Sequence, residues 1–529
     1  MSIIQVQNMT FAYEGSYDTI FKNVSFSLDT DWKTGFIGRN GRGKTTFLKL
    51  LMGWERPTGG SIAASVHFDY FPFPVEDGRQ TALEAARAMI APFSCWERRM
   101  DELLAEATDQ SLEAYGELQQ RYMEADGYII DELITREAGK LHIAGEALGR
   151  PFGTLSPGER TRLTLAALFL KKNNFLLIDE PTNHLDIEGR QLAGDYLAGK
   201  KGFILVSHDR DFLDRVVDHV ISVNRTDIEV QQGNYSTWKL NRDRQDQFEL
   251  ARNESLKRDI VRLTASAERA GQWSDRVEAS KIGEHAYDRG YVGHKAAKMM
   301  QRSKSIERRQ LAAAEEKRTL LKNLEESEPL KLVCPPYTRG RLIEAPDLTL
   351  SYGSKAAVSH LRLELEPGER ICLAGRNGCG KSTVIRYLTG APGITAHGSC
   401  RLGSGLTYSY VPQDTAFLRG GLRAFAQQEG LDESLFKAIL RKLDFSRIQF
   451  EKDMDEFSSG QKKKVLIAAS LCRPAHLYLW DEPLNFIDIL SRIQVEELIL
   501  RYQPTMIFVE HDAAFCRKIA TRTLRLDQA

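Results

Sequence analysis

The sequence lacks the features that mark membrane and secreted proteins. It holds no run of about 20 apolar residues, the length that a membrane-spanning helix needs, and the best candidate, Leu163–Leu170, is followed by Lys171 and Lys172. The first residues, MSIIQVQNMTFAYEG, also lack the basic-then-apolar pattern of a signal peptide. We therefore expect a cytoplasmic protein with no membrane partner.

Cysteine is scarce, and neither sign of charge is in excess. The seven cysteines form no C-x-x-C pair, so no zinc ribbon or disulfide framework is indicated and reduced thiols are expected. Lysine plus arginine and aspartate plus glutamate both number 72, which gives a formal net charge of zero. The whole chain therefore does not predict a polyelectrolyte partner such as DNA, and any nucleic-acid contact must come from a local patch.

The sequence does contain one phosphate-binding motif twice. GRNGRGKT at Gly38–Thr45 returns as GRNGCGKS at Gly375–Ser382, each after a short apolar stretch. Glycines in such a motif let backbone N–H groups approach phosphates, the lysine reaches the β- and γ-phosphates, and the hydroxyl can hold Mg²⁺. The motif predicts ATP and Mg²⁺ as cofactors, and its nucleotide-binding residues are Gly38, Asn40, Gly41, Gly43, Lys44, Thr45, Thr46, Gly375, Asn377, Gly378, Gly380, Lys381, Ser382 and Thr383.

The two copies belong to a longer repeat. Lys44 and Lys381 lie 337 positions apart, whereas Ser156 of LSPGE and Ser458 of FSSGQ lie 302 apart. The first half therefore carries roughly 35 additional residues between its P-loop and its LSPGE segment. This organisation predicts an α/β protein with two related ATPase units in tandem, the first with an insertion.

Two acids follow an apolar stretch in each half, at Asp179–Glu180 and Asp481–Glu482. At the carboxyl end of a strand, the first acid can reach Mg²⁺ and the second can polarise the attacking water as a general base. His208 and His511 come 28 and 29 residues after the second acid, each behind another apolar stretch. We interpret these histidines as residues that sense the γ-phosphate.

LSPGE and FSSGQ, placed between P-loop and acidic strand, resemble the signature of ABC ATPases. In that family two units pack head to tail, and the signature of one closes over nucleotide held by the other. The resemblance implies a first site that combines Lys44, Thr45, Asp179, Glu180 and His208 with Ser458, Gly460 and Gln461. It implies a second site that combines Lys381, Ser382, Asp481, Glu482 and His511 with Ser156, Gly158 and Glu159.

The resemblance also predicts that the two sites are unequal. The second half has YVPQD, in which Gln413 resembles the metal-contacting Q-loop, whereas the first half reads YFPFP with Phe73 in that place. Phenylalanine cannot bind a metal or water, so we expect different turnover. Tyr13 and Tyr352 lie 25 and 23 residues before their P-loops, where a ring can either stack on adenine or pack in a core.

The insertion and the segment between the halves both predict helices. Residues 80–134 carry apolar positions at helical spacing and are interpreted as an arm of two short helices. The stretches 235–270 and 294–328 lack glycine and proline, while the intervening Gly271–Gly293 holds four glycines. This pattern predicts a long helix, a tip loop and a return helix, paired through a seven-residue apolar repeat.

The predicted tip combines cations with rings. Its basic and aromatic residues include Trp273, Tyr287, Tyr291, His294, Lys295, Lys298 and Arg302. Cations that contact phosphate beside rings that stack on bases are typical of an RNA-binding tip, and a solvated coiled-coil surface is the alternative.

Two ABC units, an arm and a charged helical linker together resemble the ABC-F family of ribosome-associated ATPases. The domains expected are 1–238, with the arm at 80–134, the linker 239–335 and the second unit 336–529. The loop, Phe73 and the WDEPLNFID stretch look most like the Lsa/Vga/Sal-type resistance proteins. That resemblance implies a monomer that enters the E site of the 70S ribosome in its ATP-closed form.

There it would contact 23S rRNA, P-site tRNA and E-site proteins and displace lincosamides, streptogramin A or pleuromutilins, with no role for DNA. Three alternatives stay open. These are a housekeeping ABC-F factor that rescues stalled ribosomes, the ATPase subunit of a membrane transporter, and a DNA-repair ATPase.

Overall fold

The computed structural model describes residues 2–13, 19–39, 41–75, 77–106, 108–183, 185–223, 228–279, 298, 301–302, 304–306, 308–310, 312–313, 330–353 and 355–526, with 270–279 described as backbone alone. The chain divides into two compact units, Met1–Ser236 with Glu328–Ala529, and Thr237–Ser327. The larger unit holds both halves of the repeat. No helix in the described part of the chain is long and apolar enough to cross a membrane.

The first half is built on a six-stranded sheet in the order β5-β6-β7-β3-β8-β9, parallel except for its last pair. Its strands are β3 (Lys33–Gly38), β5 (His67–Phe71), β6 (Asn174–Asp179), β7 (Phe203–Val206), β8 (His219–Val223) and β9 (Ile228–Gln232). A second, antiparallel sheet has the order β2-β1-β4, with β1 (Ile3–Phe11), β2 (Phe21–Asp29) and β4 (Gly59–Ala63). Both sheets share one core around Phe36 and Phe47.

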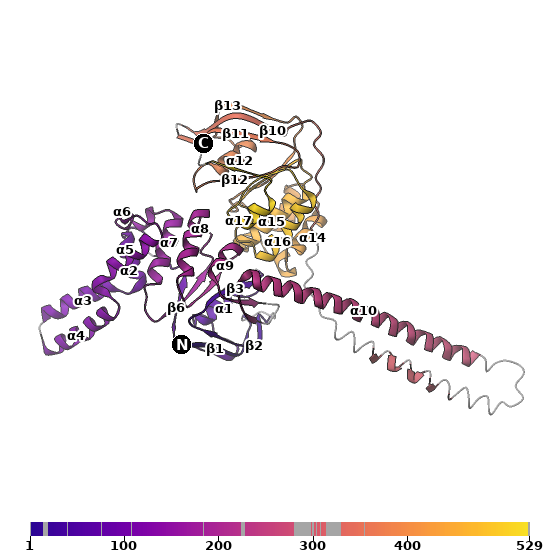
Figure 1. The fold of residues 1–529 in the computed structure, drawn as a ribbon, viewed down its shortest axis with the longest axis horizontal. Coiled ribbons are helices and arrows are strands. Elements are labelled where there is room, and N and C mark those ends of the chain that lie inside the picture. Colours follow the sequence, from indigo (N-terminus) through magenta and orange to yellow (C-terminus); the bar gives the residue numbers. More distant parts are fainter. Residues whose placement is uncertain are drawn as a thin grey trace, which may run out of the picture. The chain divides into compact units, whose positions relative to one another are not determined.

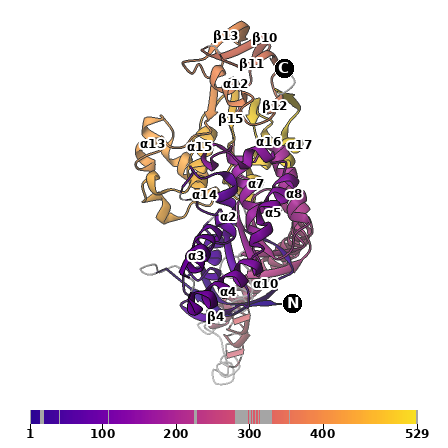
Figure 2. The ribbon, with the colours of Figure 1, turned by 90° about the vertical axis from the view of Figure 1, so that its left-hand side faces the viewer.

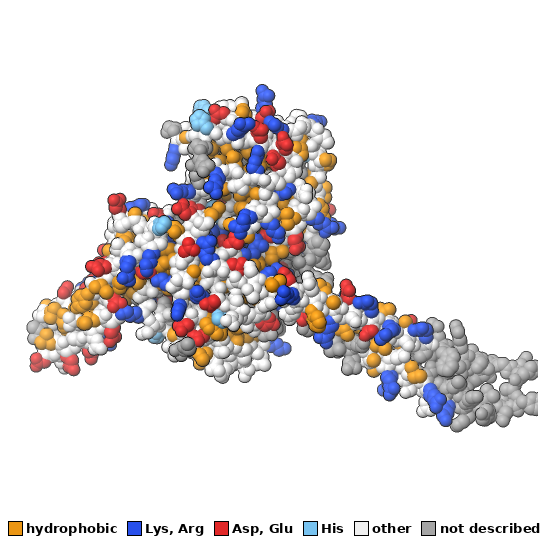
Figure 3. All heavy atoms as spheres, viewed as in Figure 1, with side chains coloured by type: hydrophobic (Ala, Val, Ile, Leu, Met, Phe, Trp, Pro, Cys, Tyr) orange, Lys and Arg blue, Asp and Glu red, His pale blue; other side chains and the backbone are white. Residues whose placement is uncertain are grey.

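The helices of the first half are α1 (Lys44–Leu51), α2 (Ala82–Ile90), α3 (Phe93–Glu106), α4 (Asp109–Glu124), α5 (Ile130–Lys140), α6 (Gly145–Leu148), α7 (Pro157–Leu168), α8 (Ile187–Ala198) and α9 (Arg210–Val216). In both Figure 1 and Figure 2, α2, α5 and α7 lie together as a helical layer. Within the range predicted as an arm, α3 and α4 pack through Phe93 and Tyr122 with ring centroids 5.6 Å apart, and the range also includes α2 and the start of α5. Figure 3 shows apolar side chains along this arm and acidic ones at its end.

The second half repeats this plan with a five-stranded sheet, β14-β15-β16-β12-β17, whose paired strands are all parallel. Its strands are β12 (Arg370–Ala374), β14 (Tyr408–Val411), β15 (Leu477–Asp481), β16 (Met506–Val509) and β17 (Arg522–Arg525). The antiparallel sheet β11-β10-β13 comprises β10 (Ile343–Tyr352), β11 (Lys355–Leu365) and β13 (Thr395–Leu402). Its helices are α12 (Lys381–Leu388), α13 (Leu422–Gln428), α14 (Glu433–Lys442), α15 (Ser459–Cys472), α16 (Ile489–Tyr502) and α17 (Ala513–Ile519).

The apolar stretches before the acids and histidines become the central strands. Phe203–Val206 and Met506–Val509 are buried at every residue, as strands covered on both faces must be. The acids and histidines therefore leave their sheets at the same carboxyl edge, where ligands bind in open α/β folds. The predicted fold class, two tandem α/β units with a long intervening helix, is confirmed.

That helix, α10 (Tyr235–Ala279), runs for 45 residues. It continues past Gly271, where the sequence predicted the tip loop to begin, because one glycine costs a long helix only about 1 kcal/mol. The described residues between 298 and 313 are helical, and the rest of the predicted loop and return helix lies outside the described residues.

Candidate functional site

Each phosphate-binding loop joins a buried strand to a helix, β3 to α1 and β12 to α12. Gly43 and Gly380 precede these helices with φ of 87° and 96°, in the left-handed region. A Cβ on Gly43 would lie 2.4 Å from the side chain of Ile20, so glycine is required there both for conformation and for space. The loops thus expose backbone N–H groups at a helix N-terminus, the arrangement that binds phosphate.

The two P-loop lysines are held in matching positions. Lys44 Nζ donates to the carbonyl of Gly38 at 2.6 Å, and Lys381 Nζ donates to that of Gly375 at 2.7 Å. Both side chains are largely buried, and burial lowers the pKa of Lys44. Each ammonium therefore lies inside its own loop, within reach of a phosphate bound there.

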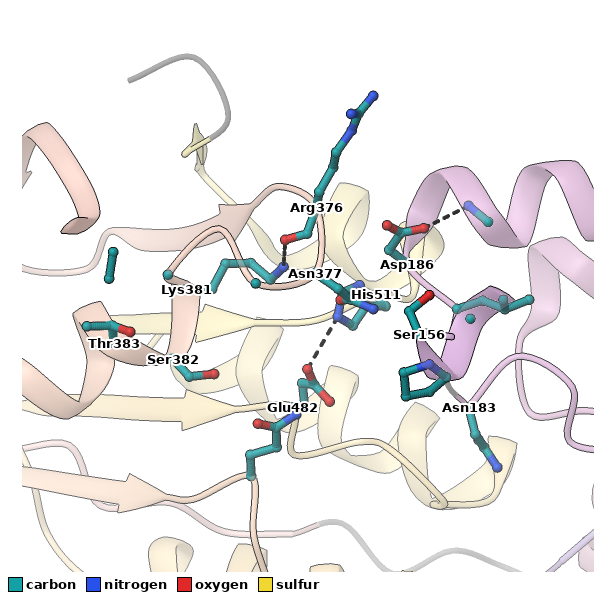
Figure 4. Close-up of a pocket in the computed structure, with 18 of the residues that line it drawn as sticks. Ser156, Asn183, Asp186, Arg376, Asn377, Lys381, Ser382, Thr383, Glu482 and His511 are labelled. Atoms are coloured by element: carbon teal, nitrogen blue, oxygen red, sulfur yellow. Dashed lines mark hydrogen bonds and ion pairs between the residues drawn. The ribbon is translucent and has the colours of Figure 1, made fainter. Parts of the chain in front are cut away.

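A cavity of about 780 Å³ opens at the second P-loop and is lined from both halves. The second half contributes Tyr352, Asn377, Gly378, Gly380, Lys381, Ser382, Thr383, Gln413, Glu482 and His511, and the first half contributes Ser156, Gly158, Asn183 and Asp186. Figure 4 shows Ser156, Asn183 and Asp186 on one side, facing Lys381, Glu482 and His511. The structure thus brings Ser156 and Gly158 of the first half to the cavity that holds Lys381, Glu482 and His511, whereas Glu159 does not line it.

The hydroxyl and the first acid of the second site lie together as a metal site requires. Ser382 Oγ donates to Asp481 Oδ1 at 3.1 Å, and the other oxygen, Oδ2, is buried with no hydrogen-bond partner among the described residues. Burial raises the pKa of Asp481 to about 6. A hydroxyl beside an unsatisfied carboxylate oxygen is a suitable donor set for Mg²⁺.

The second acid pairs with the histidine. His511 Nε2 lies 3.3 Å from Glu482 Oε1, and Asn485 Nδ2 donates to Oε2 at 2.6 Å. Burial raises the pKa of Glu482, but hydrogen bonds from His511 and Gln413 outweigh it and leave the pKa lowered. Glu482 has a φ of 48° and its counterpart Glu180 a φ of 51°, a strained conformation that is common at catalytic residues.

The first site has the same parts with different contacts. Thr45 Oγ1 lies 3.4 Å from Asp179 Oδ2, and the hydroxyl of Tyr70 donates to the same oxygen at 2.8 Å. His208 Nε2 lies 3.4 Å from Glu180 Oε1. Burial and the neighbouring Asp179 raise the pKa of Glu180, in contrast to the lowered pKa of Glu482.

The second half also reaches the first site. Ser458 caps α15 by accepting from the backbone N–H of Gln461 at 3.3 Å, and Gly460 lies in the same first turn. Lys464, one turn further on, forms a buried ion pair with Asp488 at 2.8 Å. Arg39 of the first P-loop lies 3.3 Å from Asp444, so the second half also contacts the first P-loop.

Some of the remaining predicted residues have contacts in the described part of the chain, and others lie outside it. Tyr13 donates to or accepts from Thr46 Oγ1 at 3.0 Å, and Glu159 accepts from the backbone N–H of Ser156 at 2.8 Å. Asn40 and the tip residues Tyr287, Tyr291, His294 and Lys295 lie outside the described residues, as does the side chain of Trp273, while Lys298 and Arg302 are exposed and helical.

Three residues that contribute to the sites were not assigned a role there from the sequence. Asn183 and Asp186 line the second cavity, and Tyr70 contacts Asp179. The repeat contained a signal for Asn183 and Asp186. TNHLD follows the acids in the first half and LNFID in the second, and both keep the asparagine and the final aspartate. Tyr70 carried the same signal, because Tyr410 occupies the equivalent place in the second half.

Comparison with known proteins identifies the family of the chain. The family model described as "ABC transporter" matches residues 21–183 and 358–485, more than half of the chain. The chain therefore belongs to the ABC transporter family, as a protein with two ABC ATPase domains that hydrolyse ATP. Within that family it is an ABC-F protein, similar along its whole length to relatives of that type.

Two such relatives cover nearly the whole chain. "ABC transporter F family member 2" of Arabidopsis thaliana is 26% identical over 99% of this chain and 76% of its own length. "Energy-dependent translational throttle protein EttA" of Haemophilus influenzae is 27% identical over 96% of this chain and 88% of its own length. These relatives do not single out the resistance subgroup, which stays a prediction.

A solved structure shares the fold. The archaeal ribosome recycling factor aABCE1, solved in complex with the ribosomal stalk protein aP1, aligns with a TM-score of 0.58 at 18% identity. The alignment covers 98% of this chain and 87% of that one. At this identity the likeness concerns the tandem fold alone.

Proposed function

We propose that this protein is a cytoplasmic, monomeric translation factor that binds the ribosome and uses ATP hydrolysis to control its release. The proposal is supported by the similarity to a translational throttle protein over 96% of this chain, together with a cavity at the second P-loop that is lined from both halves. Of the functions predicted from the sequence, this one corresponds to the housekeeping ABC-F alternative.

The proposed roles of the site residues follow from their contacts. Lys44 and Lys381 would bind the β- and γ-phosphates, and Ser156 and Ser458 would close over nucleotide from the opposite half. Glu180 and Glu482 would act as general bases, with His208 and His511 beside them at the γ-phosphate.

The metal contacts are proposed for Thr45 with Asp179 and for Ser382 with Asp481 and Gln413. Mg²⁺ bound there would neutralise charge on the β- and γ-phosphates. Tyr13 and Tyr352 would stack on adenine, each from the edge of its P-loop.

The proposal is tested by Glu180→Gln combined with Glu482→Gln. The amide keeps the shape of the side chain and removes the base, so ATP should bind without being hydrolysed. We expect the double variant to co-sediment with 70S ribosomes in ATP at least tenfold more than the parent, and its expression to slow growth. Lys44→Ala with Lys381→Ala is the matched control, which should neither bind ATP nor accumulate on ribosomes.

Fractionation separates this function from the transporter alternative. Co-sedimentation of the double variant with membranes, and not with ribosomes, would favour a transporter ATPase. Equal release of parent and double variant from ribosomes in ATP would contradict ATP-gated binding.

A second candidate function is displacement of ribosome-targeting antibiotics by the linker tip. It is favoured by Phe73 in place of glutamine and by the LNFID sequence after the second pair of acids. Deleting residues 280–293 should then abolish protection against lincosamides or pleuromutilins while ATPase activity in the absence of ribosomes is kept. Protection that survives the deletion, or a parent that gives none, would leave the housekeeping role.

RNA contacts are proposed for the basic end of the return helix. Lys298→Glu with Arg302→Glu should weaken ribosome binding and reduce its dependence on salt, because phosphate contacts release counterions. Binding measured from 50 to 200 mM salt checks this, and an unchanged slope would favour a solvated helix surface.

A further inference from the structure

One arginine of the first half contacts the histidine loop of each proposed ATP site. We use this name for the residues that follow the strand before each histidine, His208–Asp209 in the first half and His511–Asp512 in the second. Arg190, in α8, donates from Nη1 to Asp209 Oδ2 at 2.8 Å and to the backbone carbonyl of His511 at 3.2 Å. Asp209 directly follows His208, so the first contact lies at the first site. The second crosses to the other half of the repeat and lies at the second site.

The same guanidinium also holds the segment that faces the second cavity. Arg190 Nε donates to the carbonyl of Leu185 at 3.1 Å, between the cavity residues Asn183 and Asp186. Its side chain is only 10% exposed, and that of Asp209 is 6% exposed. A planar guanidinium that satisfies three fixed acceptors leaves little freedom to any of them.

The counterpart of Arg190 in the repeat, Arg492, has different partners. It donates to the carbonyl of Ile487 at 2.9 Å and to Asp512 Oδ2 at 3.1 Å, and both acceptors belong to its own half. The bonds that each arginine makes within its own half therefore match, and among the described residues the bond across to the partner histidine is made by Arg190 alone.

A neighbouring ion pair keeps this bond in place. Arg210, next to Asp209, pairs across the halves with Glu496, which is completely buried, and lies 3.7 Å from Asp512. The residue equivalent to Arg210 in the second half is Ala513, whose methyl group cannot form the reciprocal pair. The histidine loop of the second site is thus fastened to the first half by two arginines.

We propose that Arg190 is a positioning residue that fixes the backbone of His511 and couples the second ATP site to the first. When nucleotide moves His208 and Asp209, Arg190 transmits the movement to His511, which contacts Glu482 at 3.3 Å. This inference rests on the proposed assignment of the two ATP sites and is independent of ribosome binding.

The test measures how the first site affects the second in purified full-length protein without ribosomes. The KM for ATP at the second site is compared between the parent and Lys44→Ala, which disables the first site, and again in the presence of Arg190→Gln. We expect Lys44→Ala to change this KM by about fivefold or more in the parent, a usual size for coupling between sites, and by less than twofold with Arg190→Gln. If Arg190 had a merely structural role, Arg190→Gln would change the KM alike in the proteins with and without Lys44→Ala. The ratio of these two KM values would then stay at its parent value.

The matched control is Arg215→Gln. Arg215 lines the same small cavity as Arg190 and His511, but it pairs with Asp195 in its own half at 3.2 Å and is exposed. Its substitution should leave the ratio at the parent value. Arg190→Lys, which keeps the charge but cannot reach all three acceptors, should give an intermediate ratio and guards against a glutamine variant that does not fold.

Two outcomes would overturn the inference. One is a folded Arg190→Gln or Arg190→Lys protein in which Lys44→Ala still shifts the second-site KM as in the parent. The other is a parent in which Lys44→Ala abolishes ATP binding at the first site and leaves the second site unchanged. If Lys44→Ala does not impair ATP binding at all, the assignment of the sites fails instead.

Discussion

At the scale of single residues, the two proposed ATP sites differ around the same pair of a glutamate and a histidine. Gln413 hydrogen-bonds Glu482 in the second half, whereas Phe73 cannot do so in the first, where Tyr70 instead donates to Asp179. A general base contributes about 10²–10⁴-fold to a rate when its partners orient it. The proposed general base of the second site, Glu482, therefore has more hydrogen-bond partners to orient it than Glu180 has.

From this difference we predict unequal single variants. Glu482→Gln should remove most of the steady-state ATPase activity, and Glu180→Gln should leave the larger residual rate, by about tenfold between the two. A phosphate-release assay at saturating ATP measures both. Phe73→Gln, made in the Glu482→Gln background, should raise the residual rate. Equal residual rates of the two single variants would remove the argument for asymmetry.

At the scale of elements, a buried carboxylate joins the helical layer to the core of the first half. Glu137 of α5 accepts from Lys140 at 2.6 Å, from Lys200 at 2.7 Å and from Tyr196 of α8 at 2.8 Å. Burial raises the pKa of Glu137, but these hydrogen bonds outweigh it and lower the pKa to about 2. The folded protein therefore favours the ionised carboxylate.

Glu137→Gln should consequently destabilise the first half by about 2 kcal/mol at pH 7, the size of a hydrogen-bonded charge. Because the folded pKa lies below the unfolded value of about 4.3, this stabilisation is fully present above that value. It is lost as the pH falls toward 2. Melting temperatures at pH 7 and pH 4 test this, with the exposed Glu132→Gln on the same helix as control. A deficit that does not shrink at pH 4 would contradict the linkage.

At the scale of the whole larger unit, ion pairs join the two halves at several points. Arg39 of the first P-loop lies 3.3 Å from Asp444, and Arg376 of the second P-loop lies 3.3 Å from Glu188. The latter pair is exposed and contributes little. The pair between Arg210 and Glu496 is largely buried, and such a pair is costly to break on one side.

A double-mutant cycle should show this. Arg210→Ala or Glu496→Ala alone should each destabilise the protein by about 3 kcal/mol. Together they should cost about 1–3 kcal/mol less than the sum. Thermal unfolding measured without nucleotide reports the difference. Arg376→Ala with Glu188→Ala is the exposed control and should be nearly additive, and additivity at Arg210 as well would mean that the buried pair contributes no coupling.

The sequence by itself determined the repeat and the fold class, and it assigned most residues of the two proposed sites. Phosphate binding requires glycines at left-handed φ, a lysine and a hydroxyl at fixed spacing. The motif therefore identifies Lys44 and Lys381 from the sequence alone. The same holds for the acids at strand ends, because a buried parallel strand reads as an apolar run. The head-to-tail arrangement came from the resemblance rather than from spacing.

The tertiary structure decided what depends on contacts between distant segments. Only folding brings the hydroxyl of Tyr70 to Asp179 and Arg190 to the carbonyl of His511, 321 positions away. No local pattern specifies a backbone carbonyl as an acceptor, since every residue has one. Likewise, the sequence predicted that a loop begins at Gly271, but α10 continues to Ala279. The helical hydrogen bonds on both sides of Gly271 outweigh the small entropic cost of one glycine.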